Sequence, residues 1–379
     1  MPGKGNTAGI TGADGFIAWH LRCAMHSAGL PEARLAGRGA FESPEALRSF
    51  VEDLDVIVHL AGINRADSDA ELESANLNIA QALVSAMEET QSTPLVIYAS
   101  STHESSDTPY GRSKREAGSL LEDWAERSGA RFSRFIIPHV FGEGGRPHCN
   151  SVVSTFCSQL ASDEIPTVKH NGQLELVHAQ DLADQIIAAY TKEARPEVRI
   201  SGTPLSVVEL LDRLTEFKTT FGEHVIPRLD DKFTLRLFNT WRSYLSPEQW
   251  PIQLTLHSDE RGTLFEGVKT VNGGQGFLST TRPGVVRGGH YHRFKLERFL
   301  VARGEAKIRI RRLLEDDVRT FTVNGKQPCF IDIPTLHTHE IQNTGSEELL
   351  TFFWAHEIFD PGNPDTITAP LTRAGANHP

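Results

Sequence analysis

The chain has 379 residues, more than one typical hydrophobic core organises, and this length suggests two domains. Hydrophobic residues make up 39% and charged residues 23%, as in ordinary soluble proteins, and no apolar run approaches the roughly 20 residues that cross a bilayer. A net charge of -11 argues against general binding of DNA or RNA, which depends on basic residues. One local arginine cluster could still hold a small phosphorylated ligand.

The N-terminus and the cysteines indicate a cytoplasmic protein. Residues 1–16 lack the charged and then apolar pattern of a signal peptide. The four cysteines are scattered and form no CxxC pair, which is typical of reduced thiols in the cytosol. We therefore expect a cytoplasmic location and no membrane insertion.

The first half of the chain alternates between strand and helix patterns. Residues 7–11 predict a short strand ending in a glycine turn, and 16–28 predict a helix. The apolar, β-branched runs 55–62 and 95–101 are typical of buried parallel strands, and 74–90 between them has helical spacing. Strands separated by helices predict an α/β fold with a parallel sheet.

The pattern changes from about residue 252. Short β-rich stretches alternate with Gly, Pro and Asn turns, and helical periodicity disappears. This half predicts an all-β barrel or sandwich. The segment 244–251 contains Pro247 and Pro251 and is the expected junction, so we predict domains over 1–245 and 252–372.

A glycine turn follows the first predicted strand. Gly12, Gly15 and Ala18 lie where the strand ends and the helix begins. Glycine lets the backbone approach a pyrophosphate, and the helix N-terminus offers unpaired N–H groups and a positive dipole. Many such turns bind nothing, so the loop alone does not establish a nucleotide site.

A tyrosine and a lysine add a catalytic signal. Tyr110 and Lys114 lie one helical turn apart and share a face. A nearby ammonium favours tyrosinate, so we expect it to lower the Tyr110 pKa toward a value useful for proton transfer. Ser101 ends the strand 95–101 and can orient a substrate oxygen, with Ser100 or Thr102 as alternatives one residue away.

These stretches, in this order, resemble the extended short-chain dehydrogenase/reductase family. The resemblance implies a Rossmann-type doubly wound sheet, NAD(P), and a catalytic set of Ser101, Tyr110 and Lys114. His139 stands where the family more often has Asn. The implied cofactor contacts, besides Tyr110 and Lys114, are Gly12, Gly15, Phe16, Ile17, Arg38, Leu60, Ala61, Gly62 and Pro138. Arg38 follows the second strand, where no acidic residue is found, and an arginine there suits a 2′-phosphate and hence NADPH.

The β-rich half carries a histidine cluster. Alternate residues of a strand share a face, so His290 and His292 point together, as do His337 and His339. With Glu297 these residues form a mixed nitrogen and oxygen set suited to a divalent metal such as Zn²⁺. Single histidines on strands are usually structural, but clusters of this kind usually mark metal or catalytic sites.

The cluster resembles the two cupin motifs, which implies a cupin barrel with the metal ligands His290, His292, Glu297 and His339. The stretches 258–266 and 283–292 resemble sugar-nucleotide 3,5-epimerases, in which the residue matching His290 is the catalytic base. His290 is therefore either ligand or base, and His337 is the second candidate base. Arg287 is a candidate substrate contact.

The order of the two halves resembles one family along nearly the whole chain: the bifunctional capsular polysaccharide and O-antigen assembly enzymes known as CapF or WbjC. The family implies C3 epimerisation of a UDP-2-acetamido-2,6-dideoxy-4-keto-hexose by the cupin. Reduction of C4 with NADPH then gives UDP-2-acetamido-2,6-dideoxy-L-talose, on the route to N-acetyl-L-fucosamine. It also implies a zinc-containing homodimer, with Asn150 and Ser151 near the sugar nucleotide.

Two alternatives remain open from the sequence. The chain could act on another deoxysugar, because neither the histidines nor the Tyr–Lys pair distinguishes sugar stereochemistry. It could instead be an NADP-sensing binding protein with a structural cupin, although the presence of both Tyr110 and Lys114 counts against lost catalysis.

Overall fold

The computed structural model describes residues 7–192 and 194–372, which divide into two compact units. One unit contains Met1–Val152 and His170–Val207, and the other contains Val153–Lys169 and Val208–Pro379. The predicted boundaries at 245 and 252 mark the change from helix to strand rather than the division between these units, because three helices from the preceding sequence group with the β-rich half.

A six-stranded parallel sheet forms the centre of the first unit, as the α/β pattern predicts. The strand order is β2-β1-β3-β4-β5-β8. The strands are β1 (Ala8–Thr11), β2 (Arg34–Ala36), β3 (Val56–His59), β4 (Leu95–Ser101), β5 (Phe132–Ile137) and β8 (Glu197–Arg199). The chain begins in the middle of the sheet and builds outward in both directions, which is the doubly wound arrangement.

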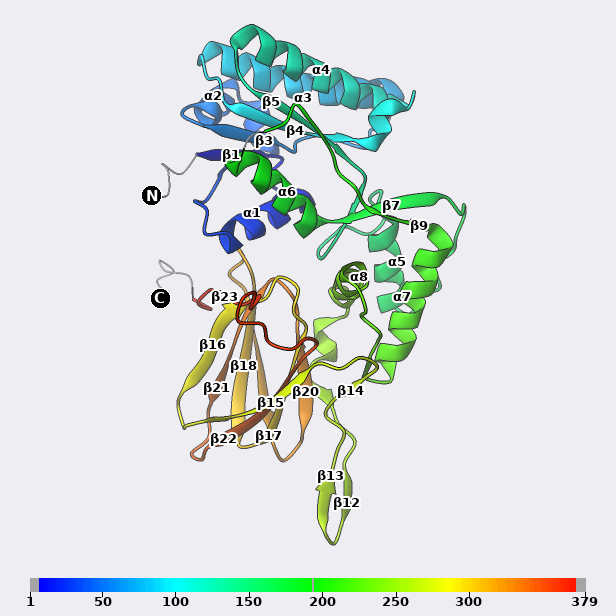
Figure 1. Cartoon of the computed structure of the whole chain (residues 1–379), viewed down its shortest axis with the longest axis vertical. Helices are drawn as coiled ribbons and strands as arrows, with labels where there is room; N and C mark the ends of the chain where they lie inside the picture. The colour runs from blue at the N-terminus through cyan, green and yellow to red at the C-terminus, as the bar shows by residue number, and fades with distance from the viewer. Residues whose placement is uncertain (1–6, 193, 373–379) are drawn as a thin grey trace. The chain divides into compact units, whose positions relative to one another are not determined.

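Helices cover both faces of this sheet (Figure 1). One apolar core joins the sheet to α1 (Phe16–Ser27) and α6 (Ala179–Thr191). The second core joins the opposite face to α2 (Pro44–Val51), α3 (Asp69–Glu89) and α4 (Pro109–Ser128). The strands are buried on both faces, which explains their nearly continuous apolar sequences.

Local capping explains where the longer helices begin. The Ser68 hydroxyl accepts a hydrogen bond from Glu71 N at 3.2 Å, so α3 starts before the predicted residue 74. Thr108 caps α4 in the same way, accepting from Gly111 N at 3.1 Å, and Pro109 occupies the first turn. The cap thus places Tyr110 in the first turn of α4 and Lys114 one turn later.

The remaining short elements of the first unit are two 3-10 turns and a small sheet. The sheet has the order β6-β7-β9. The bounds are η1 (Arg38–Glu42), η2 (Thr102–Ser105), β6 (His139–Phe141), β7 (Gln173–His178) and β9 (Thr203–Ser206).

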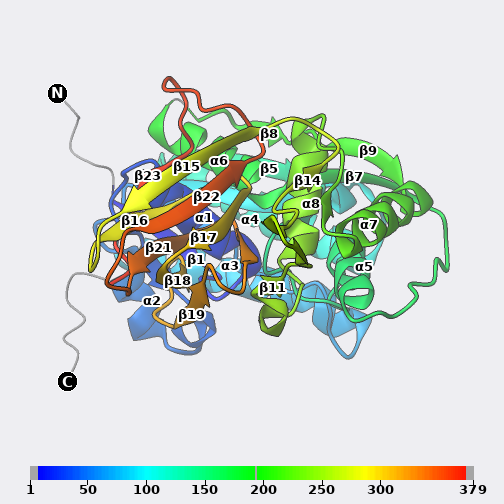
Figure 2. The same ribbon diagram turned by 90° about the horizontal axis from the view of Figure 1, so that it is seen from below.

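Two five-stranded antiparallel sheets form the barrel of the second unit, with the orders β11-β20-β17-β22-β15 and β19-β18-β21-β16-β23 (Figures 1 and 2). Their facing apolar side chains form one core. The bounds are β11 (Ile252–Gln253), β15 (Gln275–Thr281), β16 (Val286–Tyr291), β17 (Glu297–Arg303), β18 (Glu305–Arg312), β19 (Val318–Asn324), β20 (Cys329–Ile333), β21 (His337–Asn343), β22 (Leu349–Ala355) and β23 (Ile367–Thr368). The prediction of a β-barrel is confirmed.

Helices, a hairpin and minor strands complete the second unit. Hydrogen bonds tie α8 to the barrel: Asn239 Nδ2 donates to Phe294 O at 2.9 Å, and Arg242 donates to Ile333 O at 3.3 Å. The bounds are α5 (Val152–Ala161), α7 (Val207–Gly222), α8 (Lys232–Arg242), η3 (Pro247–Gln249), β10 (Val225–Ile226), β12 (His257–Asp259), β13 (Gly262–Leu264) and β14 (Lys269–Thr270). Among the described residues, no helix has the length and apolar character that would let it cross a membrane.

Candidate active sites

The glycine loop joins β1 to α1 with the geometry that a dinucleotide site needs. Gly12 has a φ of +66°, and a Cβ there would approach Ala61 N to 2.8 Å, so a larger residue does not fit. Gly15 N donates to Gly12 O at 2.9 Å, and no side chain caps α1 at Gly15. The first turn of α1, with Phe16 and Ile17, therefore presents backbone N–H groups to an anion.

The segment after β3 lies directly against this loop. Ala61 N donates to Thr11 Oγ1 at 3.1 Å, which joins the ends of β1 and β3. A Cβ on Gly62 would lie 2.8 Å from Asn76 Oδ1 and 3.5 Å from Lys114 Nζ. The predicted cofactor residues 12–17 and 60–62 are thus brought together, with the catalytic lysine beside them.

The structure brings Ser101, Tyr110 and Lys114 to the end of β4. Ser101 hydrogen-bonds to Tyr110, whereas the Ser100 hydroxyl is bonded to Glu104, so the geometry favours Ser101 over its neighbour. Lys114 is buried, and its Nζ donates to Ala99 O at 2.7 Å. The hydrogen bond to the Ala99 carbonyl holds the Lys114 ammonium beside β4 and Gly62.

The pKa of Tyr110 differs from the value expected from the sequence. Burial raises the pKa of Tyr110, and only the Ser101 hydrogen bond opposes it, so the prediction that Lys114 lowers this pKa is wrong for the protein without ligands. Burial lowers the pKa of Lys114 to about 8, against the attraction of Glu104. Tyr110 therefore stays protonated at neutral pH and can act as an acid.

Asn76 belongs to this site although the sequence did not single it out. Its side chain accepts from Ile63 N at 2.9 Å and donates to Ile63 O and Ser113 Oγ, each at 2.9 Å. These three bonds connect α3, the segment after β3 and α4. A buried amide on an otherwise apolar helical face was the available signal.

An acidic residue does lie near the end of β2, contrary to the sequence-based expectation. It is Asp14 of the glycine loop: its Oδ2 would be 2.6 Å from a Cβ on Gly37. Arg38 follows Gly37 in η1 and is exposed. A ligand at this edge would therefore meet both a carboxylate and a guanidinium.

Three further predicted residues lie in loops of the same unit. Pro138 separates β5 from β6, and Ser151 precedes α5. Asn150 has its side chain turned to the segment after β3, since its Oδ1 accepts from Arg65 Nε at 2.6 Å and its Nδ2 donates to Asn64 O at 3.2 Å.

In the second unit, His290, His292, Glu297 and His339 form one cluster. One ligand atom from each lies within 4.8 Å of the others. Residues 290 and 339 are opposite each other on the paired strands β16 and β21, while Glu297 begins β17. The four residues predicted as metal ligands therefore converge, although they come from different strands.

Hydrogen bonds on the far side of two rings direct their other nitrogens inward. His292 Nδ1 donates to Asp365 O at 2.5 Å, and His339 Nδ1 donates to His337 O at 3.2 Å. Their Nε2 atoms lie 2.9 and 3.6 Å from Glu297 Oε2, and both are buried without a hydrogen-bond partner. Without a metal, burial alone would lower the pKa of His292, but Glu297 and Asp365 raise it, so a proton on His292 can balance the carboxylate. The set of two inward-facing imidazoles and a carboxylate also fits a divalent metal.

The charge of Glu297 agrees with this arrangement. Burial alone would raise its pKa, but the imidazoles of His292 and His339 hold it below the usual value. Burial and the two neighbouring histidines lower the pKa of His290 to about 4, which leaves its ring neutral near pH 7. Ionised carboxylate and neutral imidazole are the forms that bind metals.

Two other predicted residues lie outside this cluster. His337 begins β21, partly exposed, and its Nδ1 bonds to Thr335 O at 2.7 Å. Arg287 is exposed on β16 and donates to Thr280 O at 3.1 Å. Asp365, which holds His292, was missed, because nothing in its local sequence indicates a partner 73 residues away.

The two units thus define a dinucleotide-binding domain of the short-chain dehydrogenase/reductase type and a cupin. Residues 8–200 match the model of the NAD dependent epimerase/dehydratase family, and residues 257–367 match the polysaccharide biosynthesis C-terminal domain. The chain belongs to the NAD dependent epimerase/dehydratase family, which identifies a nicotinamide dinucleotide as its cofactor.

Full-length relatives share both domains. The chain is 33% identical over 370 residues to the UDP-2-acetamido-2,6-beta-L-arabino-hexul-4-ose reductase of Pseudomonas aeruginosa strain PA103, covering 94% of this chain and 96% of the relative. The capsular polysaccharide assembling protein CapF of Staphylococcus aureus is 31% identical with a TM-score of 0.64, covering 96% of this chain and all of CapF. The predicted relationship to the CapF/WbjC enzymes is confirmed.

A more distant structure resembles one domain alone. The UDP-N-acetylglucosamine 4-epimerase of Bacillus cereus is 20% identical with a TM-score of 0.51, over 56% of this chain and 82% of its own. This similarity concerns the fold.

Proposed function

We propose that the chain is a bifunctional UDP-sugar enzyme whose cupin epimerises C3 of a UDP-2-acetamido-2,6-dideoxy-4-keto-hexose and whose first unit reduces the C4 ketone with NADPH. The product is UDP-2-acetamido-2,6-dideoxy-L-talose, on the route to UDP-N-acetyl-L-fucosamine. The named activity of the Pseudomonas relative supports the substrate class. The arrangement of Ser101, Tyr110 and Lys114 carries the chemistry.

Tyr110 is the proton donor in the reduction. NADPH supplies a hydride to C4 when bound. The Tyr110 hydroxyl gives its proton to the oxygen that becomes the C4 hydroxyl, and Ser101 holds that oxygen in place. Burial keeps Tyr110 protonated until it transfers the proton, and the buried Lys114, one helical turn away, would hold the cofactor ribose.

Epimerisation needs a base and stabilisation of negative charge. The 4-keto group acidifies the C3–H bond; a base removes this proton to give an enolate, and a proton that originates from solvent is added to C3 on the opposite face. Because His290 belongs to the ligand cluster, we assign the base to His337, which is partly exposed and lies two residues before the ligand His339 on β21. A Zn²⁺ held by the cluster would stabilise negative charge on the substrate oxygen, and Arg287 would contact the substrate.

Cofactor preference and assembly belong to the same proposal. Arg38 would hold the 2′-phosphate of NADPH, next to Asp14, and Asn150 and Ser151 would contact the sugar nucleotide.

The enzyme acts as a homodimer in the cytoplasm. Supporting observations are the exposed apolar side chains Phe277, Leu278, Val285 and Val286 on and beside β15 and β16, and four free cysteines.

The test is to incubate the purified protein with the 4-keto sugar nucleotide in D₂O, with and without NADPH, and to follow it by NMR. Deuterium entering at C3 without cofactor, followed by reduction at C4 once NADPH is added, is the expected result. Reduction without exchange at C3 would remove the epimerase from the proposal. Neither reaction would mean that the substrate is another keto sugar.

A further inference from the structure

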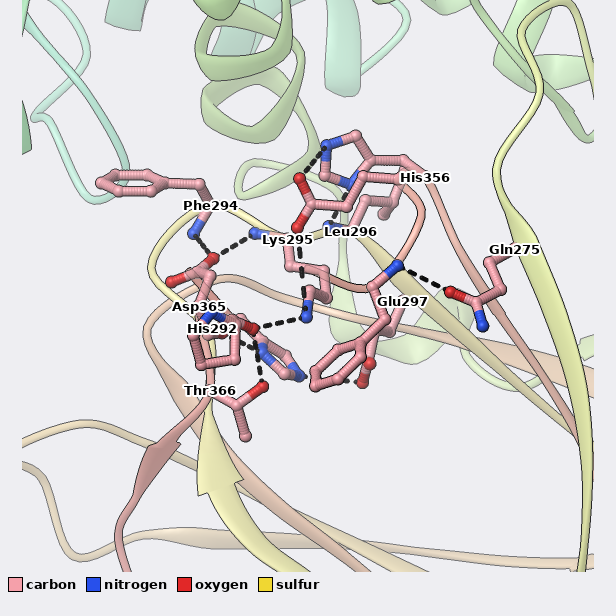
Figure 3. A network of polar contacts seen from close by, with 12 residues as sticks. Gln275, His292, Phe294, Lys295, Leu296, Glu297, His356, Asp365 and Thr366 are labelled. Carbon is pink, nitrogen blue, oxygen red and sulfur yellow. Dashed lines mark hydrogen bonds and ion pairs between the residues drawn. The ribbon is translucent and has the colours of Figure 1, made fainter. Parts of the chain in front are cut away.

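One residue of the C-terminal segment holds the turn between two proposed metal ligands (Figure 3). The Asp365 carboxylate accepts three consecutive backbone N–H bonds, from Arg293 at 3.0 Å and from Phe294 and Lys295 at 2.8 Å each. These three residues connect His292 to the beginning of β17. Three N–H groups on one carboxylate are a strong, charge-assisted anchor.

The same residue holds the histidine itself. The Asp365 carbonyl oxygen accepts the His292 Nδ1 hydrogen at 2.5 Å. This bond fixes both the ring orientation and the tautomer, so that Nε2 faces Glu297. Backbone and side chain of one residue thus act on a ligand and on the turn that follows it.

The backbone of Asp365 is in an unfavourable conformation. Its φ is +38°, in the left-handed region that residues other than glycine rarely adopt. Such a conformation persists where surrounding contacts determine it. Here those contacts are the four hydrogen bonds to residues 292–295.

Neighbouring contacts fasten the segment on both sides of the turn. Lys295 is buried, and its Nζ donates to Pro364 O at 2.7 Å. His356 accepts from Leu296 N through Nδ1, and its own N donates to Leu296 O, each at 3.1 Å. Each residue from 292 to 296 is therefore hydrogen-bonded to the segment 356–366.

We propose that Asp365 is a positioning residue for the metal centre, which it preorganises by fixing the His292 ring and the turn that leads to Glu297. The inference rests on the metal-binding part of the proposed function. Asp365 need not touch metal or substrate, since it acts through His292. Its removal should therefore weaken metal binding without changing the set of ligands.

Asp365→Asn is the sharpest variant, because asparagine keeps the size and tolerates a positive φ. Its amide group places an N–H₂ donor against backbone N–H donors, so the anchor loses at least one partner. Asp360→Asn is the matched control in the same segment: Asp360 is exposed, and its Oδ1 accepts from Gly362 N at 2.8 Å. Asp365→Ala removes all three side-chain hydrogen bonds and should weaken metal binding in the same direction as Asp365→Asn, and by more.

The measurement is a zinc titration of the full-length apoprotein against a chelating dye. Asp365→Asn keeps the backbone carbonyl that binds His292 Nδ1 but weakens the side-chain anchor of the turn, so Zn²⁺ binding should weaken by about tenfold, the lower end of the range for lost outer-shell partners. Asp360→Asn should leave it unchanged. Without metal, hydrogen exchange of the amides at 293–295 should also be faster in Asp365→Asn, and this readout does not depend on activity.

The outcomes separate the inference from the proposed function. If the unchanged protein binds no Zn²⁺ or other divalent metal, the metal centre fails and the inference fails with it. If it binds Zn²⁺ and Asp365→Asn binds it equally well, the inference alone is overturned, even if the variant is less stable. Faster exchange together with weaker binding, both absent in Asp360→Asn, supports the positioning role.

Discussion

The two candidate sites are assembled in different ways. In the first unit, the glycine loop is a short continuous segment, and Tyr110 and Lys114 lie one helical turn apart on α4. In the cupin, His290 and His339 meet only because β16 pairs with β21 in a particular register. Asp365 then reaches His292 from 73 residues away. The first site joins segments with locally determined geometry through the parallel sheet, whereas the ligand set of the second depends on strand register.

This difference explains how each site responds to change. The Tyr110–Lys114 spacing is kept as long as α4 forms, although the sheet must still bring β4 and the segment after β3 to it. A site built from several strands depends on register, and on contacts that hold each ligand in place. The following experiments test whether the two sites are separable and whether the first is as local as it appears in the sequence.

The largest expected effect is on reduction in Tyr110→Phe. Without the hydroxyl, no proton reaches the C4 oxygen, and the reduction rate should fall by about 10²- to 10⁴-fold. NADPH oxidation measures this rate. Deuterium exchange at C3 in the same variant should be unchanged and serves as its control. A parallel loss of exchange would show that the two sites are not separable.

A buried contact between a glutamate and a histidine provides a test of locality in the first unit. Glu143 Oε2 lies 3.1 Å from His178 Nε2, and both residues are buried. Burial alone would raise the Glu143 pKa, but His178 and His20 hold it at about 2. Glu143→Gln keeps a hydrogen-bonding side chain but removes the carboxylate that His178 and His20 stabilise, so it should cost about 1 to 3 kcal/mol.

The pH dependence of this pair has a definite sign. Because the folded pKa of Glu143 lies below the 4.5 of an unperturbed glutamate, its stabilisation is present above that pH and is lost as pH falls toward about 2. Hydrogen exchange of peptides from β6 and β7 in the full chain measures both effects. An unchanged exchange rate in Glu143→Gln would show that the contact between Glu143 and His178 does not stabilise β6 and β7.

The pH profile of reduction should report on Lys114. Burial lowers its pKa to about 8, so the ammonium is present below that pH and is lost above it. The kcat/KM of reduction should be level below about pH 8 and should fall by up to tenfold per pH unit above it. In Lys114→Arg the guanidinium stays charged, so any remaining activity should not show this decline. A decline at the same pH in that variant would assign it to another group.

The smallest expected effect concerns the cofactor. If Arg38 holds a 2′-phosphate, Arg38→Gln should raise the KM for NADPH roughly tenfold, the loss expected for one charge-assisted hydrogen bond, and leave that for NADH unchanged. Asp14→Asn is the companion variant, because it removes the carboxylate that lies against Gly37. It should improve binding of NADPH relative to NADH. If Arg38→Gln raised the KM for NADPH and for NADH equally, Arg38 would not be the residue that binds the 2′-phosphate.

The sequence by itself determined the features that depend on neighbouring residues. Apolar runs and helical spacing predicted β1, β4, α1 and the β-rich second half. The glycine turn and the four-residue separation of Tyr110 and Lys114 follow from backbone geometry, which is the same wherever such a segment folds. The spacing of His290, His292 and Glu297 likewise indicated a metal cluster.

Only the tertiary structure decided what depends on burial and on distant partners. It showed that burial raises the Tyr110 pKa despite the lysine on the same face, and that Asp14 comes beside Gly37 from another loop. It also brought Asp365 to His292 from 73 residues away. Solvent exclusion and strand register are properties of the folded chain, and no local pattern of residues specifies them.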